Sequence, residues 1–358
     1  MIEYIVILFL STILSFFYSI SKNKLFKIIC LFVLVLVLSI LYYIRDFSIG
    51  TDTHAYVDYF ELLKNIKYSE IFYYANAYNV EFFFFIISKL LLDVFGSIQM
   101  IFFVYAIILY TTLISSFRML NLNLVLLVLS IFSFFPIFYY NFNILRQSIA
   151  LSFIILSCVY LIRGQNNNFL LLIVIAGLFH SSALVCILFY FIYKYRDYIY
   201  NKIFYFIIFF MSSFYLFLKA ISGYLDKYIV YIEVSDGKPF SFSIIFIFSL
   251  ISIFSYIVRN KANLQWYKDV LKFFNIVLLF FISYNILLYV IGISNQGLNR
   301  IGFYFLWPII FIVPILIRTQ FKGNNRIVVN MLSLVLYVLA SFYLLVNQSE
   351  SIIPFQYG

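Results

Sequence analysis

The sequence predicts an all-α, polytopic integral membrane protein with roughly 10–12 transmembrane helices, some of them broken or re-entrant. Of its 358 residues, 65% are hydrophobic and 11% are charged, with a mean hydropathy of +1.05. A soluble domain carries about 25% charged residues. Apolar runs recur close to the ~20 residues that a spanning helix needs. Basic residues gather in the short loops between these runs, as topology determinants do. We therefore expect one membrane domain over residues 1–358.

Composition also argues against several other classes of protein. The net charge of +10 does not indicate a nucleic-acid partner, because the basic residues are spread over many short loops. Cys30, Cys158 and Cys186 each lie inside an apolar segment, without disulfide or metal spacing, and are expected to be packing residues. The first segment, 2–20, carries Glu3 where a signal peptide carries lysines, so we expect a retained helix.

Each spanning segment is predicted from an uninterrupted apolar run. The candidate segments are 2–20, 25–44, 81–95, 98–117, 122–140, 144–162, 168–193, 202–219, 241–258, 270–291, 301–317 and 327–346. Three lysines in the first loop, Lys22, Lys24 and Lys27, place that loop inside the cell. Residues 45–80 and 220–240 are then expected to form extracytoplasmic loops.

The middle of the chain allows two topologies. In the first, segments 81–95 and 168–193 each cross the membrane once. Arg118 is then outside the cell and Arg146 lies on the inner face, away from the polar residues of the 45–80 loop.

In the second topology, the first of these segments enters the membrane and returns, and the second is a hairpin of two half-helices interrupted at 177–182. Arg118 and Arg163 become cytoplasmic, and Arg146 and His180 face the outer side. We favour this topology because it accounts for both irregular segments. Broken helices at membrane depth are tolerated where they line an enclosed or watery cavity.

A polar cluster directly follows the second apolar run. Arg45, Thr51, Asp52 and Tyr56 lie in it, and Asp52 has two readings. It can cap the helix that follows, or it can be a carboxylate that accepts a proton from a hydroxyl or binds sugar hydroxyls. We expect Tyr56 at the headgroup level of the membrane.

A second cluster precedes the segment 144–162 and contains Asn143, Arg146 and Gln147. Arg146 begins an apolar helix, where a fixed charge is costly unless it faces a cavity or a partner. Its guanidinium suits two phosphate oxygens, although a snorkelling arginine is the alternative. Glu81 is expected to pair either with Lys89 or with a cavity arginine.

Two more candidates interrupt apolar segments. His180 lies midway along 168–193, where a neutral imidazole can accept a proton or simply bond a backbone carbonyl. Asn299 and Arg300 precede the segment 301–317 and repeat the pattern of a cation at a helix start. A chain with two histidines and no ligand spacing does not indicate zinc.

Together these residues favour transfer of a sugar from a lipid pyrophosphate. Arginine charge stabilises the departing pyrophosphate where negative charge grows. Asp52 or His180 would deprotonate the acceptor hydroxyl. One supported carboxylate favours inversion over a double displacement at the anomeric carbon.

At these same residues the sequence resembles the Wzy-type polysaccharide polymerases of the EpsG branch. The resemblance rests on an ordered set spanning most of the chain: Arg45 with Gly50-Thr51-Asp52-Thr53 and Tyr56, then 143–150, then 178–184, then Asn299-Arg300. It implies a GT-C-like membrane glycosyltransferase in the bacterial cytoplasmic membrane. Such enzymes polymerise O-antigen, capsule or exopolysaccharide repeat units outside that membrane. Arg146 and Arg300 would bind pyrophosphate, and His180 would be a site residue.

The resemblance further implies the partners of the reaction. Donor and acceptor are oligosaccharides on undecaprenyl pyrophosphate in the membrane lipid, a separate protein controls chain length, and no metal or cofactor is required. Two other functions share these features. An O-antigen ligase-like transferase uses the same donor with another acceptor. A lipid-linked oligosaccharide flippase or other transporter also has a central cavity, but its usual internal repeat is not seen.

Overall fold

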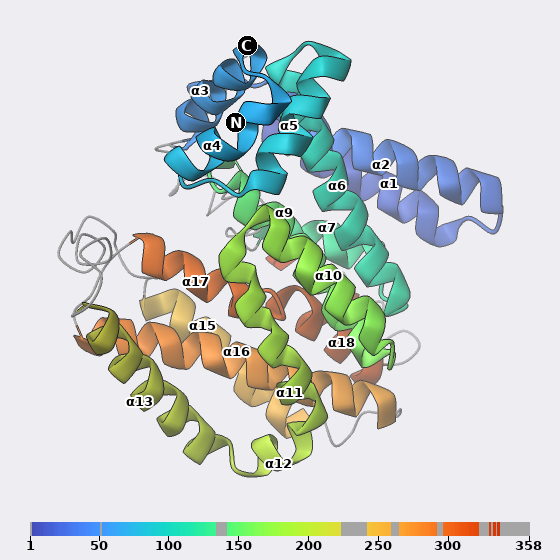
Figure 1. Cartoon of the computed structure of the whole chain (residues 1–358). Helices are drawn as coiled ribbons and strands as arrows, with labels where there is room; N and C mark the ends of the chain where they lie inside the picture. Colours follow the sequence, from blue (N-terminus) through green and yellow to red (C-terminus); the bar gives the residue numbers. More distant parts are fainter. Residues whose placement is uncertain are drawn as a thin grey trace. The chain divides into compact units, whose positions relative to one another are not determined.

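The computed structural model describes residues 2–50, 52–133, 142–222, 242–258, 265–291 and 296–321, and six single positions between 329 and 336. Within these ranges the regular elements are helices (Figure 1), which confirms the predicted all-α class. The chain forms two compact units, Met1–Val185 with Ile327–Gly358, and Cys186–Arg326. Thr51, the loop from residue 223 to 240 and most of segment 327–346 lie outside the described residues.

Six helices in the described residues are long and apolar enough to cross a membrane. They are Ile2–Ile20, Lys24–Ile44, Ile98–Met119, Leu145–Ile162, Gln265–Val290 and Arg300–Gln320. Shorter apolar helices accompany them at Asn166–Phe179, Ser181–Lys194, Ile203–Ser213 and Ile245–Ile257. The chain is therefore a multi-pass membrane protein, as its composition predicts.

The long helices of the first unit follow its apolar runs closely. They are α1 (Ile2–Ile20), α2 (Lys24–Ile44), α6 (Ile98–Met119), α7 (Leu124–Ser133), α9 (Leu145–Ile162) and α10 (Asn166–Phe179). Figure 1 shows α1 and α2 side by side as a hairpin. Asn23 ends this turn by accepting hydrogen bonds from the Leu25 and Phe26 amides at 2.9 and 3.2 Å, which satisfies two of the free N–H groups of a helix start.

Shorter helices fill the predicted 45–80 loop and the segment after it. They are α3 (Thr53–Asn65), the 3₁₀ turn η1 (Tyr68–Glu70), α4 (Ile71–Ala77) and α5 (Phe82–Phe95). α3 and α4 both pack on α5. A left-handed turn at Gly96, with φ +67°, connects α5 to α6. The Ser88 and Tyr105 hydroxyls form a 2.8 Å hydrogen bond between these two helices.

The first unit has two polar ends. At one end Arg45 lies over the ring of Phe102 in the second turn of α6, 4.5 Å from its centre. At the other end Lys27 and Arg118 approach the Tyr18 ring within 5.2 and 5.9 Å. α6 therefore runs from the Arg45 end to the Tyr18 end, and Arg118 shares its end with the basic first loop.

This grouping decides between the two predicted topologies. Arg146 bonds Glu81 at the Arg45 end, whereas Arg118 lies at the Tyr18 end. The topology in which segment 81–95 crosses once would place Arg118 at the Arg45 end and Arg146 at the Tyr18 end. That prediction is therefore wrong.

One part of the favoured topology also needs correction. α5 starts beside Arg146, and Asp93 in its last turn accepts a 2.7 Å hydrogen bond from Tyr68 of the preceding loop. Both ends of α5 thus lie at the Arg45 end. However, α5 is one uninterrupted helix, so the chain reverses at Gly96 between α5 and α6 and not inside the segment.

The predicted interruption in segment 168–193 is confirmed. α10 ends at Phe179, His180 is extended (φ −154°, ψ 108°), and a 3₁₀ turn η3 (Ser181–Ile187) precedes α11 (Leu188–Lys194). The paired arrangement of the two half-helices stays a prediction, because α10 and α11 belong to different units.

Among the described residues, the second unit contains α11 and six further helices. They are α12 (Arg196–Asn201), α13 (Ile203–Ser222), α15 (Phe242–Val258), α16 (Gln265–Ile291), α17 (Gln296–Leu306) and α18 (Ile309–Gln320). The predicted span 301–317 is divided at Trp307 and Pro308, since proline has no N–H to continue the helix. The buried Trp307 ring packs on Phe274 and Phe311.

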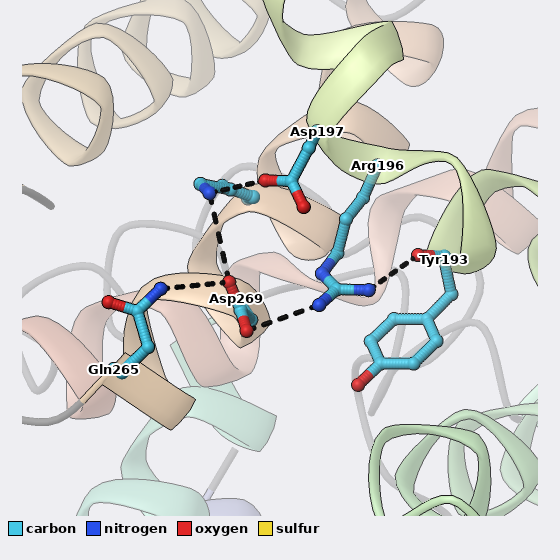
Figure 2. A network of polar contacts seen from close by, with 6 residues as sticks. Tyr193, Arg196, Asp197, Gln265 and Asp269 are labelled. Atoms are coloured by element: carbon cyan, nitrogen blue, oxygen red, sulfur yellow. Dashed lines mark hydrogen bonds and ion pairs between the residues drawn. The ribbon is translucent and has the colours of Figure 1, made fainter.

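Ion pairs join α12 to α16 in this unit (Figure 2). Asp269 accepts hydrogen bonds from Arg196 at 3.1 Å and from Gln265 at 3.5 Å. Lys272 contacts both Asp197 and Asp269. The Arg196 guanidinium also donates to the Tyr193 carbonyl at 2.9 Å and lies over the Tyr193 ring. This network holds the short helix α12 against the long helix α16.

Candidate functional site

Residues 45–50 and Asp52 belong to a short connection between α2 and α3. Asp46 accepts a 2.8 Å hydrogen bond from the Ser48 amide, and the Thr53 amide donates to the Gly50 carbonyl at 3.1 Å. Gly50 has φ +93°, a backbone conformation that side chains disfavour. The Thr53 hydroxyl closes the loop by donating to the Ile49 carbonyl at 2.6 Å.

This loop is fixed against the start of α9. Arg45 and the Thr53 hydroxyl both donate to the Phe142 carbonyl, at 3.1 and 3.3 Å. A Cβ at Gly50 would lie 2.5 Å from Asn143 Oδ1 and 2.8 Å from the Phe142 carbonyl oxygen. The structure thus brings two of the predicted motifs together, although about 90 residues separate them along the chain.

Arg45 is a buried part of this junction. Its side chain is 1% exposed, and its guanidinium lies between 4.5 and 5.5 Å from the ring centres of Tyr42, Phe102 and Phe142. These contacts indicate that Arg45 shapes the site, whereas the substrate contact predicted for it stays a prediction.

Glu81 is the centre of the candidate site. Its Oε2 accepts from Arg146 Nη1 at 2.5 Å. Its Oε1 lies 3.1 Å from His180 Nδ1 and accepts from the Ser181 amide at 2.9 Å and the Ser181 hydroxyl at 3.3 Å. One carboxylate therefore joins the starts of α5 and α9 to the break after α10.

Electrostatics keep this carboxylate ionised. Burial raises the pKa of Glu81, but the hydrogen bond with His180, the charge of Arg146 and the Ser181 amide outweigh burial and lower the pKa to about 2. Glu81 is thus a carboxylate acceptor at neutral pH. His180 Nδ1 then carries the hydrogen that faces Glu81, which leaves Nε2 of a neutral ring with a lone pair.

The position of His180 depends on the aromatic residue before it. The Phe179 ring packs on Phe83, Tyr105 and Phe153 at centroid distances of 5.4, 6.1 and 5.9 Å. These partners come from α5, α6 and α9. The end of α10 is therefore anchored in the core of the unit, while the His180 side chain stays 27% exposed.

Tyr56 and Asp52 lie beside the same cluster. Burial raises the pKa of the Tyr56 hydroxyl, and the nearby positive charge of Arg146 opposes this shift. The charge of Asp52 acts on Tyr56 in the opposite sense to Arg146. Asp52 is the residue before α3, but its side chain makes no capping hydrogen bond to the helix start, so the capping alternative finds no support.

Two polar groups of the second motif have no partner in the described residues. Asn143 Oδ1 and Arg146 Nε are buried and form no hydrogen bond there. Such groups are costly unless something satisfies them, and a bound phosphate or sugar has suitable atoms. Gln147 is buried one residue further on.

The fourth motif lies in the second unit. Arg300 is on α17 and is partly buried, and the Asn299 side chain lies outside the described set, as does Thr51. Their predicted substrate contacts stay predictions. No group of three or more histidine, cysteine or acidic side chains in the described residues has a metal-binding arrangement.

Sequence analysis did not predict that Glu81 is the centre of the candidate site. It places this residue in an ion pair with Lys89 or an arginine, and the structure selects Arg146, whereas Lys89 pairs with Asp93 at 3.0 Å. The role of Ser181 as a donor to Glu81 was not anticipated. The available signal was an acidic residue placed immediately before an apolar helix, which needs a partner to be tolerated there.

These features define a helical membrane protein with a half-buried Glu–Arg–His cluster at one end of its first unit. A family model matches residues 28–357, which is most of the chain, and it describes the EpsG family. The chain belongs to this family, which indicates a membrane protein of the polysaccharide-polymerase type. No curated protein and no solved structure gives a significant match.

Proposed function

We propose that this protein is a membrane glycosyltransferase that polymerises oligosaccharide repeat units carried on undecaprenyl pyrophosphate. The products would be O-antigen, capsular or exopolysaccharide, made outside the bacterial cytoplasmic membrane. The observation that carries the proposal is the Glu81 carboxylate, which holds Arg146 and His180 in one site. EpsG family membership supports it.

Charge distribution supports the extracytoplasmic side. The end of the first unit opposite the site carries Lys27 and Arg118, next to the loop with Lys22 and Lys24. Loops rich in lysine and arginine stay in the cytoplasm. The Glu81 end would then face outwards, where the lipid-linked repeat units are joined.

In the proposed reaction Arg146 stabilises the leaving group. Its guanidinium is oriented by Glu81 and interacts electrostatically with Tyr56, and its buried Nε lacks a described partner. Negative charge grows on the pyrophosphate as the glycosidic bond breaks. A fixed cation placed there lowers the barrier without reorganising at the moment of reaction.

His180 would act as the general base. Glu81 holds Nδ1–H, so Nε2 accepts the proton of the acceptor hydroxyl. The hydroxyl oxygen bonds to the anomeric carbon, the bond from that carbon to the pyrophosphate oxygen breaks, and undecaprenyl pyrophosphate leaves with the electron pair. General base catalysis of this kind contributes about 10²–10⁴-fold to rate.

The same contacts favour inversion at the anomeric carbon. A retaining double displacement requires a free nucleophile, by analogy with glycosidases. Both oxygens of Glu81 already accept hydrogen bonds, from Arg146 and from His180 with Ser181. A single displacement assisted by His180 needs no further carboxylate. NMR of the glycosidic linkage against that of the donor tests this, and a retained configuration would overturn it.

The decisive experiment supplies the purified protein with undecaprenyl-pyrophosphate repeat units. We expect a ladder of longer lipid-linked glycans from the wild-type protein. His180→Ala should lower the rate of ladder formation by about 10²–10⁴-fold, and Glu81→Gln should lower it as well, because Nδ1 and Arg146 lose their common acceptor.

The matched control is Glu61→Gln. Glu61 lies in the same predicted outer loop, but its side chain is 53% exposed, and its ion pair within the described residues is with Lys64. This variant should polymerise at the wild-type rate. Normal polymerisation by both Glu81→Gln and His180→Ala would refute the site. Transbilayer movement of the lipid without a ladder would indicate a flippase, and transfer to an acceptor that is not lipid-pyrophosphate-linked would indicate a ligase-like enzyme.

The remaining partners follow from the family resemblance. Donor and acceptor would both be lipid-linked oligosaccharides in the membrane, and a separate regulator protein would set chain length. Co-purification with a membrane chain-length regulator from the same cell, and a change in ladder length on adding it, would test that partner.

A further inference from the structure

A second polar site lies at the other end of the first unit. It is a cavity of about 670 Å³ between the ends of α1, α6 and α9. Arg118 in the last turn of α6 and Arg163 directly after α9 line it, together with the hydroxyl-bearing side chains of Tyr18 and Tyr160 and the amide of Asn121. It is distinct from the Glu81 site, because Arg118 is 16 residues along α6 from Phe102, or about 24 Å.

The cavity carries unbalanced positive charge. None of its lining residues is acidic. Neither Arg118 nor Arg163 forms an ion pair with any residue that the structure describes. A third cation, Lys27, lies over the Tyr18 ring, 5.2 Å from its centre. Arginines in this arrangement present planar donors that match phosphate oxygens.

The depth of the cavity points to a lipid. α1, α6 and α9 are all long and apolar enough to span a membrane, and each ends at this cavity. The lining arginines would therefore lie at headgroup level. Apolar side chains close in sequence to the lining residues are open to the surroundings, including Phe17 on α1 and Leu170 and Leu171 on the shorter helix α10, at 43, 43 and 58% exposure.

We propose that this cavity binds the phosphate headgroup of an anionic phospholipid. Arg118 and Arg163 would bond the phosphate oxygens, the hydroxyls and the Asn121 amide would contact the rest of the headgroup, and the acyl chains would run along the exposed apolar faces. Basic pockets between membrane helices on the cytoplasmic side are a recognised lipid-binding arrangement.

The test is native mass spectrometry of the full-length protein in detergent, titrated with phosphatidylglycerol or phosphatidylcholine. We expect the wild-type protein to retain phosphatidylglycerol preferentially. Each arginine near an anionic headgroup contributes about five-fold to binding, so Arg118→Gln combined with Arg163→Gln should weaken phosphatidylglycerol binding by about 25-fold.

The control removes two charges from the same end of the unit without touching the cavity. Lys22→Gln combined with Lys24→Gln should change binding by less than about two-fold, because neither side chain lines the cavity. Equal binding by the arginine variant and the wild-type protein would overturn the proposal, as would equal binding of the two lipids by the wild-type protein.

Two further measurements separate lipid from soluble phosphate and folding from binding. Inorganic phosphate and glycerol phosphate should not displace phosphatidylglycerol from the wild-type protein. Displacement by either one would show that the cavity binds a soluble anion and would overturn the lipid proposal. The variant with Arg118→Lys and Arg163→Lys keeps both charges and should still bind phosphatidylglycerol preferentially. If it loses this preference while its size-exclusion elution profile matches that of the wild-type protein, the proposal is contradicted. No step depends on polymerase activity.

Discussion

Substitution of Gly50 by alanine should destabilise the protein far more than the same change at Gly96. Both glycines have positive φ, +93° and +67°, so an alanine at either costs about 1–2 kcal/mol of backbone strain. At Gly96 nothing lies within 4 Å of the added Cβ, and strain is the whole effect.

At Gly50 the added Cβ meets packed atoms. It would lie 2.8 Å from both the Phe142 carbonyl oxygen and the Thr53 hydroxyl, and 2.5 Å from Asn143 Oδ1. Overpacking of this kind adds about 1–3 kcal/mol, which brings the cost of Gly50→Ala to about 2–5 kcal/mol. Relief requires the loop to move away from Phe142 and so to disturb the start of α9, where Arg146 lies.

The assay is thermal unfolding of the two purified variants in one detergent, followed by size-exclusion chromatography of the heated samples. The drop in midpoint for Gly50→Ala should be about 1.5 to 4 times the drop for Gly96→Ala. Polymerase activity below the melting range should fall for Gly50→Ala alone. Equal midpoints for the two variants would refute the close packing of the loop on Phe142.

Three further outcomes follow from the same contacts. The pKa of Glu81 falls from 4.5 to about 2 on folding. Its carboxylate therefore contributes on the order of 3 kcal/mol to the free energy of unfolding above pH 4.5, and this contribution is lost as the pH falls towards 2. Melting curves between pH 5 and 3 should show a steeper loss of stability for the wild-type protein than for Glu81→Gln. Thr53→Val removes the hydroxyl that donates to two carbonyls and should cost about 1–2 kcal/mol in the same melts. Thr53→Ser keeps the hydroxyl and should lose only the contribution of one buried methyl group, about 0.8 kcal/mol. Asp269→Asn should cost about 1 kcal/mol of stability, because this carboxylate faces both Arg196 and Lys272. The Asp197 side chain is 61% exposed. If Asp269→Asn lowers stability no more than Asp197→Asn does, Asp269 is not the centre of the network.

The membrane helices could be predicted from the sequence because their signal is local. The run 2–20 begins and ends as α1 does, and 98–117 differs from α6 by two residues at its end. The interruption at His180 was also visible, as a polar residue inside an apolar run. Such features depend on residues that are neighbours along the chain.

The centre of the site could not be predicted in the same way. Glu81 meets Arg146 and His180 across separations of 65 and 99 residues. Local pattern indicates that each of the three needs a partner, but it does not indicate which one. Similarly, the burial of Arg45 under three aromatic rings depends on how α2, α6 and the start of α9 pack.

The packing of Phe179 has a consequence for how this chain can vary in length. Its ring fixes the rotation of α10 against three other helices. Inserting one residue within α10 would turn everything beyond the insertion by about 100°. Either Phe179 would leave its aromatic neighbours or His180 would swing away from Glu81. An insertion in the turn before Asn166 imposes no such choice. The contacts of Phe179 and His180 therefore fix the number of residues in α10. The turn that precedes α10 can change in length without breaking these contacts.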